Sequence, residues 1–458
     1  QYFSKNVSEL SLAESALLAG LPQSPTKYSP FGAHPELAKQ RQLQVLERMA
    51  EDGYITQNQA DKAASLPLHY ASPENSILAP HFVMYIKDLL VSQFGEKLVT
   101  QGGLQVHTTL DLDLQNLAQK NLNHELTTLQ SFRISNGAIL ITQPQTGQIL
   151  TMVGSHDYFD IEHDGQVNLT TSLRQPGSAI KPINYALALE KGYTPATIIL
   201  DEPITFSIPG SPPWSPKNYD GHFHGSITLR TALGSSYNIP AVKLLELNGI
   251  NQMVQLAKDL GITTWDDPNR FGLALTLGSN EVKMTDLAQV YGTFANLGIN
   301  VPLNPILFIT DSSGKNLSFS PCQKSVPAPD FGLTNPVQAA TDNDCLPHQA
   351  ISPETAYLIS DILSDNQARS PAFGTHSVLN IKNNQVAVKT GTSNNLRDNW
   401  TIGYTPDYLV AVWVGNNDNQ PMSHVASGIT GASPIWAKTI TQLLANSLQA
   451  YFPTPPNI

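Results

Sequence analysis

Two groups of apolar, β-type segments, far apart in the chain, most constrain what this sequence can fold into. The first is a hairpin over 138–154, in which AILITQ and QILTMVG flank the turn residues PQTG. The second contains VAVKTGTS at 386–393, WTIGY at 400–404 and YLVAVWVG at 408–415, separated by turn-sized gaps. Long loops and helical patterns fill the chain between the two groups. We therefore expect an α+β domain whose sheet is completed by strands that are distant in sequence.

The first 76 residues have a helical pattern. Ser11 is placed to cap the segment LAESALLAGL, and a second helix is expected from Pro35 to a stop at Gly53. Thr56 is placed to cap a third helix, ITQNQADKAASL. We predict a separate helical domain over 1–76.

Three further parts are predicted after this domain. Residues 77–133 combine an apolar helix with a strand that leads into another helix, and are predicted to form a connector. The main domain, which holds both strand groups, is predicted over 134–447, with a tail over 448–458. The 458 residues are long enough for two or three domains, since a domain usually has about 100–200 residues.

The composition is that of a folded protein and argues against several classes. Hydrophobic residues make up 41% of the chain and charged residues only 14%. A net charge of −11 argues against nucleic acid or an anionic membrane surface as the main partner. No apolar run approaches the roughly 20 residues of a membrane-spanning helix, and we expect no signal peptide within this sequence, which opens in QYFSKNVSEL. Composition leaves open whether the chain is cytosolic or has lost a targeting segment.

Cys322 and Cys345 are the two cysteines, in a polar, Pro-rich stretch. In an oxidising compartment they could pair, which would stabilise the fold by about 3 kcal/mol, and two unpaired thiols fit the sequence equally well. No Cys/His cluster has the spacing of a zinc site, so we predict neither a metal site nor a cofactor.

The segment Ser178-Ala-Ile-Lys181 carries the first chemical signal. Residues three apart on a helix share a face, so Lys181 can reach the Ser178 hydroxyl and act as its base. Pro176-Gly177 favours a turn before this helix, and Pro182 falls in its first turn, where a missing N–H costs little. Ser-x-x-Lys alone is a weak signal, because the pattern also occurs in loops at 24–27 and 312–315.

A second signal is Lys389-Thr390-Gly391-Thr392, directly after the apolar residues Val386-Ala387-Val388. A glycine on an edge strand lets another backbone approach closely. The Lys389 ammonium and the hydroxyls of Thr390 and Thr392 can hold a carboxylate, and an extended peptide can bind alongside such a strand.

The third signal, Ser-x-Asn, is ambiguous in this chain. Its matches are Ser4–Asn6, Ser236–Asn238, Ser364–Asn366 and Ser393–Asn395. The match at Ser364 ends the helical pattern SPETAYLISDIL, which indicates a structural role. Ser236-Tyr237-Asn238 instead links two helical segments, and we choose Ser236 and Asn238, although Asn238 could be only a helix N-cap.

Together these motifs resemble the acyl-serine transferases that penicillin acylates, and the surrounding residues resemble class A penicillin-binding proteins, closest to the 1C-type subgroup. The resemblance covers nearly the whole chain. It is carried by SLAESALLAGLPQSPTKYSP (11–30), GGLQVHTTLDLDLQ (102–115), RQPGSAIKPINYALALEKG (174–192), VAVKTGTSNNLRDNWTIGYTPDYLVAVWVGN (386–416) and SGITGASPIW (427–436). It implies a penicillin-binding transpeptidase, or serine β-lactamase-like, fold: an antiparallel sheet with helices, after a helical remnant of a lysozyme-like glycosyltransferase domain.

Two features depart from that family. The glycosyltransferase glutamates of the family match nothing here, and Glu51-Asp52 reads as a helix C-terminus. We therefore expect the chain to derive from a bifunctional parent, whose membrane anchor would precede QYFSK. The extra C-terminal domain often found in the 1C subgroup is not expected, since the sequence stops at Ile458.

The resemblance implies a role for each motif in the first half of the reaction. Ser178 would attack the penultimate D-alanine of a stem peptide while Lys181 takes its proton. Ser236 would help to pass a proton to the departing D-alanine, and Asn238 would hold the peptide amide. Lys181 can act as a base only if burial and the nearby Lys389 charge lower its pKa.

The same resemblance assigns the substrate groove. Lys389, Thr390 and Thr392 would grip the terminal carboxylate, with Gly391 between them, and we expect Lys389 to be chiefly an electrostatic anchor. The backbone N–H groups of Ser178 and Thr392 would form the oxyanion hole.

The expected partners are stem peptides ending in D-Ala-D-Ala, with β-lactam antibiotics as covalent inhibitors and no nucleic acid. The expected location is extracytoplasmic. A D,D-carboxypeptidase, a non-catalytic β-lactam sensor and a serine β-lactamase stay as alternatives. The last is disfavoured because Glu246, Glu281 and Glu354 do not match the deacylating Glu-x-x-Leu-Asn motif of the common class of those enzymes.

Overall fold

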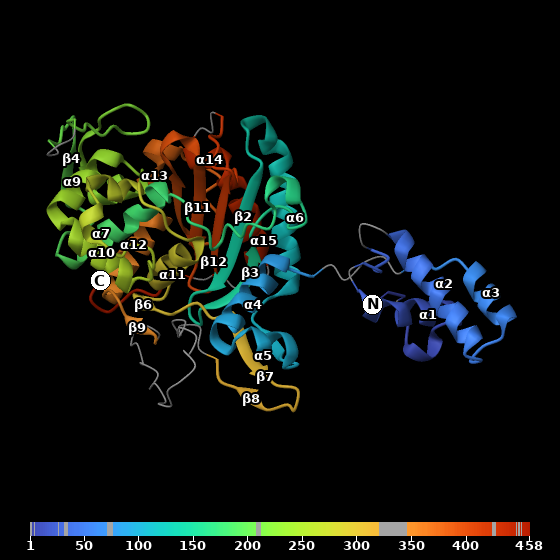
Figure 1. Ribbon diagram of the computed structural model, residues 1–458. Coiled ribbons are helices and arrows are strands. Elements are labelled where there is room, and N and C mark those ends of the chain that lie inside the picture. The colour runs from blue at the N-terminus through green and yellow to red at the C-terminus, as the bar shows by residue number, and fades with distance from the viewer. Residues whose placement is uncertain are drawn as a thin grey trace. The chain divides into compact units, whose positions relative to one another are not determined.

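The computed structural model describes residues 2–3, 5–25, 27–31, 35–70, 77–207, 212–319, 346–423, 427–445, 447, 449 and 451–458. The chain forms two compact units, Gln1–Leu78 and Ala79–Ile458. Figure 1 colours the chain from blue at its N-terminus to red at its C-terminus. The predicted boundaries near 76, 133 and 447 stay predictions. Cys322 and Cys345 lie outside the described residues, so the question of their pairing does too.

The N-terminal unit is helical, as its sequence pattern predicts. Its elements are η1 Val7–Glu9, α1 Leu12–Gly20, η2 Leu21–Gln23, α2 Pro35–Glu51 and α3 Gln57–Ser65. Ser11 caps α1 in a reciprocal box with Glu14, and Thr56 caps α3 in the same way with Gln59. The predicted caps are therefore confirmed.

A five-stranded antiparallel sheet forms the centre of the second unit. Its strands, in spatial order, are β10 Ala387–Thr392, β11 Asp398–Tyr404, β12 Leu409–Gly415, β2 Asn136–Gln143 and β3 Gln148–Val153. The pairing of β12 with β2 runs from Leu409 opposite Thr142 to Gly415 opposite Asn136. The two strand groups of the sequence thus meet in one sheet, which confirms the α+β prediction and leaves β10 at an edge.

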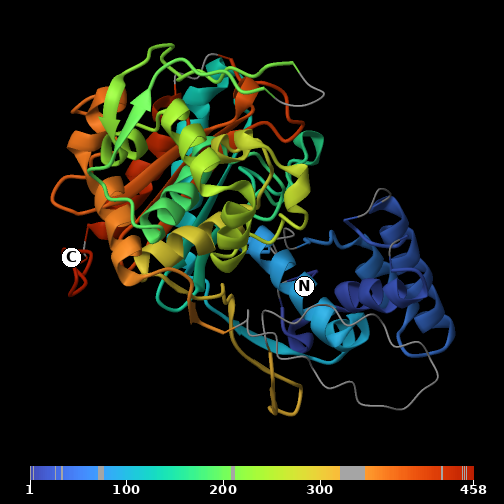
Figure 2. The same cartoon turned by 90° about the vertical axis from the view of Figure 1, so that its left-hand side faces the viewer.

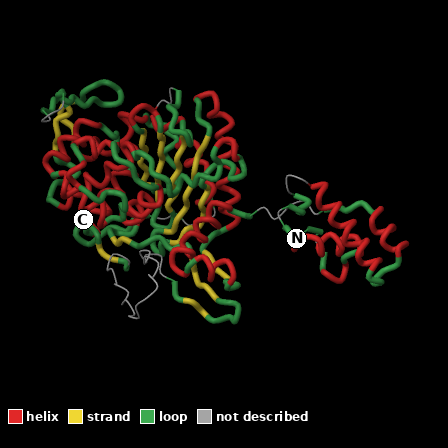
Figure 3. The backbone as a smooth tube through the Cα atoms, viewed as in Figure 1, coloured by secondary structure: helices red, strands yellow, loops and turns green. Residues whose placement is uncertain are grey.

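The remaining elements of this unit surround the sheet or form small sheets of their own. The helices are α4 Pro80–Phe94, α5 Glu96–Gln101, α6 Leu112–Leu129, α7 Lys181–Glu190, α8 Leu229–Gly234, α9 Asn238–Asn248, α10 Ile250–Asp259, α11 Met284–Ala295, α12 Pro353–Ser364, α13 Asn366–Phe373, α14 Ser427–Thr430 and α15 Ala432–Leu444. The 3₁₀ turns are η3 Gln130–Phe132, η4 Ile161–His163, η5 Gly177–Ile180, η6 Pro268–Arg270, η7 Leu273–Leu277 and η9 Asn394–Leu396. The smaller sheets are β1 Gln105–Thr108 with β7 Ile306–Thr310 and β8 Asn316–Leu317, β4 Ile198–Asp201 with β5 Gly225–Thr228, and β6 Ile299–Asn300 with β9 His348–Gln349 (Figure 3).

Helices cover both faces of the central sheet, as Figures 1 and 2 show. Successive side chains of β12 point to opposite faces. Val410, Val412 and Val414 pack in the core cluster that contains residues of α6 and α15. Leu409 and Trp413 pack in the larger cluster, with residues of α7, α11 and α12. All seven residues of β12 are buried, which explains why the segment is apolar without interruption.

No helix among the described residues is both long and apolar enough to cross a membrane.

Candidate active site

Ser178 lies on the short 3₁₀ turn η5, which runs directly into α7. The sequence predicted a helix start here, and the structure differs only in the tighter first turn. Pro182 lies in the first turn of α7, as expected, and the helix ends at Glu190. Ser178 is half-buried, whereas Lys181 is fully buried, so the serine faces the solvent side of the turn and the lysine the interior.

Gly391 lets the edge strand β10 pass directly against the Ser178 turn. A Cβ atom at Gly391 would lie 2.2 Å from the Pro176 carbonyl oxygen and 3.0 Å from the Ala179 nitrogen. The sequence predicted that this glycine permits close approach of another backbone. The backbone that approaches it within the chain is that of the serine turn, and this contact joins β10 to η5.

The Lys181 ammonium connects the serine turn to the segment between α8 and α9. Its Nζ donates to the Ser236 carbonyl at 2.6 Å, to the Tyr237 carbonyl at 3.1 Å and to Asn238 Oδ1 at 2.7 Å. A longer contact of 3.5 Å reaches Ser236 Oγ. The Ser178 hydroxyl is not among these partners, so the base role expected for Lys181 stays a prediction; in sites without substrate, catalytic hydrogen bonds are often long or unformed.

The link between α8 and α9 holds Ser236 in an unusual backbone conformation. Its φ of 59° lies in the left-handed region, which non-glycine residues rarely occupy. Asn238 is the first residue of α9, and the residue before it occupies the cap position, so the side chain of Asn238 does not act as an N-cap. Ser364 ends α12, and its hydroxyl donates to the Asp361 carbonyl at 3.1 Å. The structure therefore brings Ser236, and not Ser364, to Lys181.

Lys389 is buried, and its ammonium contacts Ser236. Its side chain is 3% exposed, and its Nζ donates to Ser236 Oγ at 2.7 Å and to its neighbour's carbonyl, Thr390 O, at 2.8 Å. The structure therefore buries this cation and bonds it to Ser236, and the expectation that Lys389 is chiefly an electrostatic anchor stays a prediction. By strand alternation Lys389 shares a face of β10 with Ala387 and with Gly391, which packs against the serine turn, so its charge lies beside Ser236 within the site.

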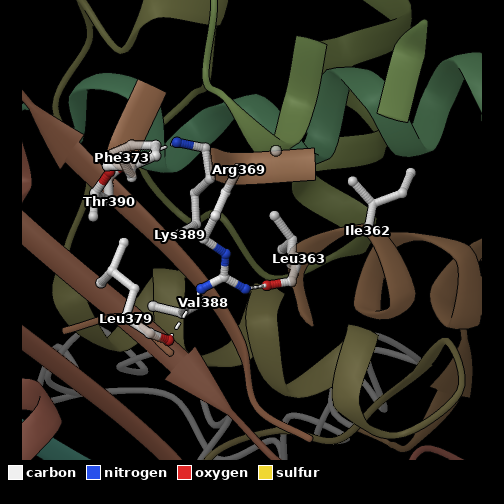
Figure 4. A pocket seen from close by; sticks show the side chains of 9 residues that line it. Ile362, Leu363, Arg369, Phe373, Leu379, Val388, Lys389 and Thr390 are labelled. Atoms are coloured by element: carbon white, nitrogen blue, oxygen red, sulfur yellow. Dashed lines mark hydrogen bonds between the residues drawn. The ribbon is translucent and has the colours of Figure 1, made fainter. Parts of the chain in front are cut away.

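A second buried cation accompanies Lys389. Arg369, from α13, is 4% exposed and donates to the carbonyls of Leu379 at 3.0 Å and Leu363 at 2.5 Å. Figure 4 shows its guanidinium held between those two carbonyls, with the Lys389 side chain alongside in a small pocket lined mainly by apolar residues. Among the described residues, no carboxylate forms an ion pair with Arg369.

These burials change the acid–base properties of both lysines. Burial lowers the pKa of Lys181 well below its usual value, and the Lys389 charge lowers it further. Burial also lowers the pKa of Lys389 to about 7, with the positive charge of Arg369 as the second cause. Lys389 is therefore able to release a proton near neutral pH, and the lowered pKa of Lys181 agrees with the direction expected for it.

An open groove of about 350 Å³ is lined by residues from all three motifs. The members of its lining that the sequence singled out are Ser178, Ser236, Asn238, Thr390, Gly391 and Thr392. Tyr219 and Asp220 also line it, from the loop before β5. Among the residues that the structure describes, no group of His, Cys, Asp or Glu side chains is arranged to hold a metal ion.

The fold and this grouping of serines and lysines are those of the penicillin-binding class of proteins. The chain belongs to the family described as "Penicillin binding protein transpeptidase domain", which matches residues 137–439. The family described as "Transglycosylase" matches residues 1–50, within the helical N-terminal unit.

Similar proteins are penicillin-binding proteins from several bacteria. Penicillin-binding protein 1A of Aquifex aeolicus is 29% identical over 97% of this chain and 68% of its own length. The crystal structure of penicillin-binding protein 1A from Haemophilus influenzae matches all of this chain and 83% of its own with a TM-score of 0.79 at 24% identity. PonA1 of Mycobacterium tuberculosis, solved in complex with penicillin V, matches 82% of this chain and 96% of its own with a TM-score of 0.65 at 21% identity. At these identities the solved structures support the fold.

Sequence reasoning missed Arg369 and the loop residues Lys217 and Asn218, which contact Asn238. Arg369 is a single charge in a polar helical segment, and no pattern distinguishes it from an exposed arginine. Asn218 lies in the polar loop PKNYDGHFHG, which carries no periodic signal. Only the tertiary structure, in which this loop reaches the start of α9, shows that Asn218 contacts Asn238.

Proposed function

We propose that this chain is a serine-type D-Ala-D-Ala transpeptidase that cross-links peptidoglycan stem peptides and is acylated by β-lactams. The observation that carries the proposal is the position of Lys181. It is buried, its pKa is lowered, and it contacts Ser236 and Asn238 beside the groove that Ser178 lines. An acyl-serine enzyme needs this combination of a nucleophile, a base that is partly neutral and a second hydroxyl for the leaving group.

In the first half of the proposed reaction, the neutral Lys181 amine accepts the Ser178 proton as Oγ attacks the carbonyl of the penultimate D-alanine. The tetrahedral oxyanion would be stabilised by the backbone N–H groups of Ser178 and Thr392. Collapse breaks the peptide bond and leaves an acyl ester on Ser178. The terminal D-alanine leaves as an amine after taking a proton through Ser236, whose Oγ accepts a hydrogen bond from Lys389.

In the second half, the amine of another stem peptide attacks the ester and restores the Ser178 hydroxyl. Water in place of that amine would give a D,D-carboxypeptidase. The edge position of β10 supports binding of the donor peptide as an added strand, with the hydroxyls of Thr390 and Thr392 at its carboxylate. The positive charge of Lys389 would attract this carboxylate from beneath the two hydroxyls, and it would also act through Ser236, to which the ammonium is bonded.

The wider setting is also proposed. The match of residues 1–50 to the transglycosylase family supports a bifunctional parent that also polymerises glycan, acting on the extracytoplasmic side of the membrane. The chain spans 68% of the Aquifex aeolicus relative, so the activity of a whole protein of that kind is not assigned to these residues alone. Assignment to the 1C-type subgroup rests on the segments 386–416 and 427–436, whereas the relatives named above are of the 1A type.

Intact-mass spectrometry after incubation with benzylpenicillin tests this function. We expect a stable mass increase of one penicillin in the wild type and none in a folded Ser178→Ala variant. The penicillin V complex of a similar fold is the reason for choosing this class of probe. Labelling of the Ser178→Ala variant would move the nucleophile elsewhere, and rapid loss of the added mass would favour a β-lactamase. Stable labelling without cross-linking or release of D-alanine would favour a sensor.

A further inference from the structure

A buried carboxylate lies behind the Ser236–Asn238 segment, outside the groove. Asp201, the last residue of β4, is 0% exposed. The side-chain amide of Asn218 donates to both of its oxygens, at 2.9 Å and 2.7 Å. The backbone N–H of His224 donates to it at 3.0 Å. Because a carboxylate only accepts, the NH₂ group of Asn218 must face Asp201, which fixes the amide in one of its two orientations.

That orientation directs the Asn218 carbonyl oxygen to the start of α9. Asn218 Oδ1 accepts from the backbone N–H of Asn238 at 2.7 Å and from that of Ile239 at 3.3 Å. The first N–H groups of a helix have no partner within it, and the Tyr237 cap position supplies no side-chain bond. Asn218 therefore caps α9 from a segment that is not adjacent in sequence.

The residue before Asn218 holds the other end of Asn238. The Lys217 carbonyl accepts from Asn238 Nδ2 at 2.8 Å, so Asn238 Oδ1 is left to face Lys181, where it accepts at 2.7 Å. Two consecutive loop residues thus fix both the backbone and the side-chain amide of Asn238.

His224 completes the support from the same loop. Its Nδ1 lies 2.6 Å from Asp201 Oδ2 and its Nε2 lies 3.1 Å from Asp220 Oδ2. Its ring stacks on Tyr237, with centroids 3.9 Å apart and planes at 18°. The middle residue of the Ser236–Asn238 segment is therefore held against an imidazole that two carboxylates keep in place.

We propose that Asn218, oriented by Asp201 and His224, is the positioning residue that sets Ser236 and Asn238 against Lys181 for acylation. This inference rests on the proposed function and adds to it a part of the molecule that none of the sequence motifs contains. The φ of 59° at Ser236 supports the need for such a device, because a strained backbone persists only where its surroundings hold it.

The charged and titratable groups around Asp201 define the test. His224 faces it from the loop, with Asp220 on the other ring nitrogen of His224. The Asp201 charge also helps to raise the pKa of Tyr185 of α7 and of Tyr237, so these two tyrosines are the other titratable groups near it. Lys243 of α9 donates to the neighbouring Leu200 carbonyl.

The decisive variant is Asn218→Asp, which keeps the shape and the accepting oxygen but places two carboxylates together. Above neutral pH they repel, so we expect acylation by fluorescent penicillin to fall roughly 10- to 100-fold as Asn238 shifts. At lower pH the pair can share one proton, which restores a donor toward Asp201. The ratio of the variant rate to the wild-type rate should therefore rise as the pH falls. Taking the ratio of the two rates cancels the pH dependence that Lys181 gives to acylation in both proteins.

Two further variants separate positioning from general damage. Asn300→Asp is the matched control, because Asn300 is also buried, donates to the Asp259 carbonyl and accepts from Gln289, away from the groove. It should show a ratio that does not rise with falling pH. Asp201→Asn removes the acceptor that orients Asn218, so acylation should be slow without recovery at low pH. This variant keeps the test decisive if Asn218→Asp fails to fold.

A pH-independent ratio in folded Asn218→Asp, or a wild-type rate in Asp201→Asn, would overturn the inference while leaving the proposed function intact. A wild type that penicillin does not acylate would instead refute the proposed function, and this inference with it.

Discussion

The contact between Gly391 and the serine turn gives a sharp test of how the site is assembled. In Gly391→Ala, the new methyl group would lie 2.2 Å from the Pro176 carbonyl oxygen, whereas ordinary contact begins at 3.4 Å. The atoms that it meets are two backbone atoms and the Ala179 Cβ, all in the turn that carries Ser178. No flexible side chain can move aside, so β10 and η5 must separate by about 1.2 Å, a distance that follows from those two values.

The expected effect on rate is larger than the effect on folding. A misplacement of about 1 Å between reacting groups can cost roughly 100-fold in rate, so we expect acylation by penicillin to slow by about that factor. Overpacking a buried contact usually costs about 1–3 kcal/mol of stability, and the entropic benefit of replacing a strand glycine offsets only about 0.5–1 kcal/mol of it. The variant should therefore fold, with a lower melting temperature.

The assay is the second-order rate of labelling by a fluorescent penicillin, measured beside a thermal melt. Gly272→Ala is the control, because a Cβ there meets nothing within 4 Å and its backbone is extended. It should label at the wild-type rate. If Gly391→Ala labelled as fast as Gly272→Ala with an unchanged melting temperature, the close packing of β10 on the serine turn would be wrong.

Four other predictions concern the same site. Ser236→Ala should slow acylation strongly and Ser364→Ala hardly at all, because only Ser236 contacts the two lysines; equal rates in the two variants would contradict this. Lys389→Ala should slow peptides with a free C-terminal carboxylate more than amide-capped peptides, and Lys389→Arg should retain part of the rate because it keeps the charge; equal loss with both peptides would instead indicate proton transfer through Ser236, to which the ammonium is bonded. Folding lowers the Lys389 pKa from 10.5 to about 7, so the unfolded chain binds more protons between these pH values, and stability toward urea should rise with pH across that window. Arg369→Met removes a like charge, raises the pKa of Lys389 and should weaken this rise; a steeper rise in the variant would refute the coupling.

Local patterns in the sequence were sufficient for much of the fold. Capping residues and periodic apolar positions located α1, α2 and α3, and strand-type runs located all five strands of the central sheet. Two strand groups with helices between them required a sheet that joins distant strands, because an apolar strand must pair with another strand. The order of Ser178, Ser236 and Lys389 along the chain also grouped these residues correctly, since all three are in or beside one site.

Side-chain direction could not be predicted in the same way. The motif suggested a Lys389 cation displayed along the groove, whereas the structure buries this cation and bonds it to Ser236. The sequence likewise suggested that Lys181 meets Ser178, whereas the carbonyls between α8 and α9 are its partners here.

The sequence by itself determined the elements, their distant pairing and the residue types of the three motifs, because propensity, periodicity and capping act over a few residues. Only the tertiary structure decided which backbone passes Gly391, that Arg369 lies beside Lys389, and that Lys217 and Asn218 clamp Asn238. These contacts join segments far apart in the chain, and their energies come from burial and hydrogen bonding that exist only after the sheet and helices have packed.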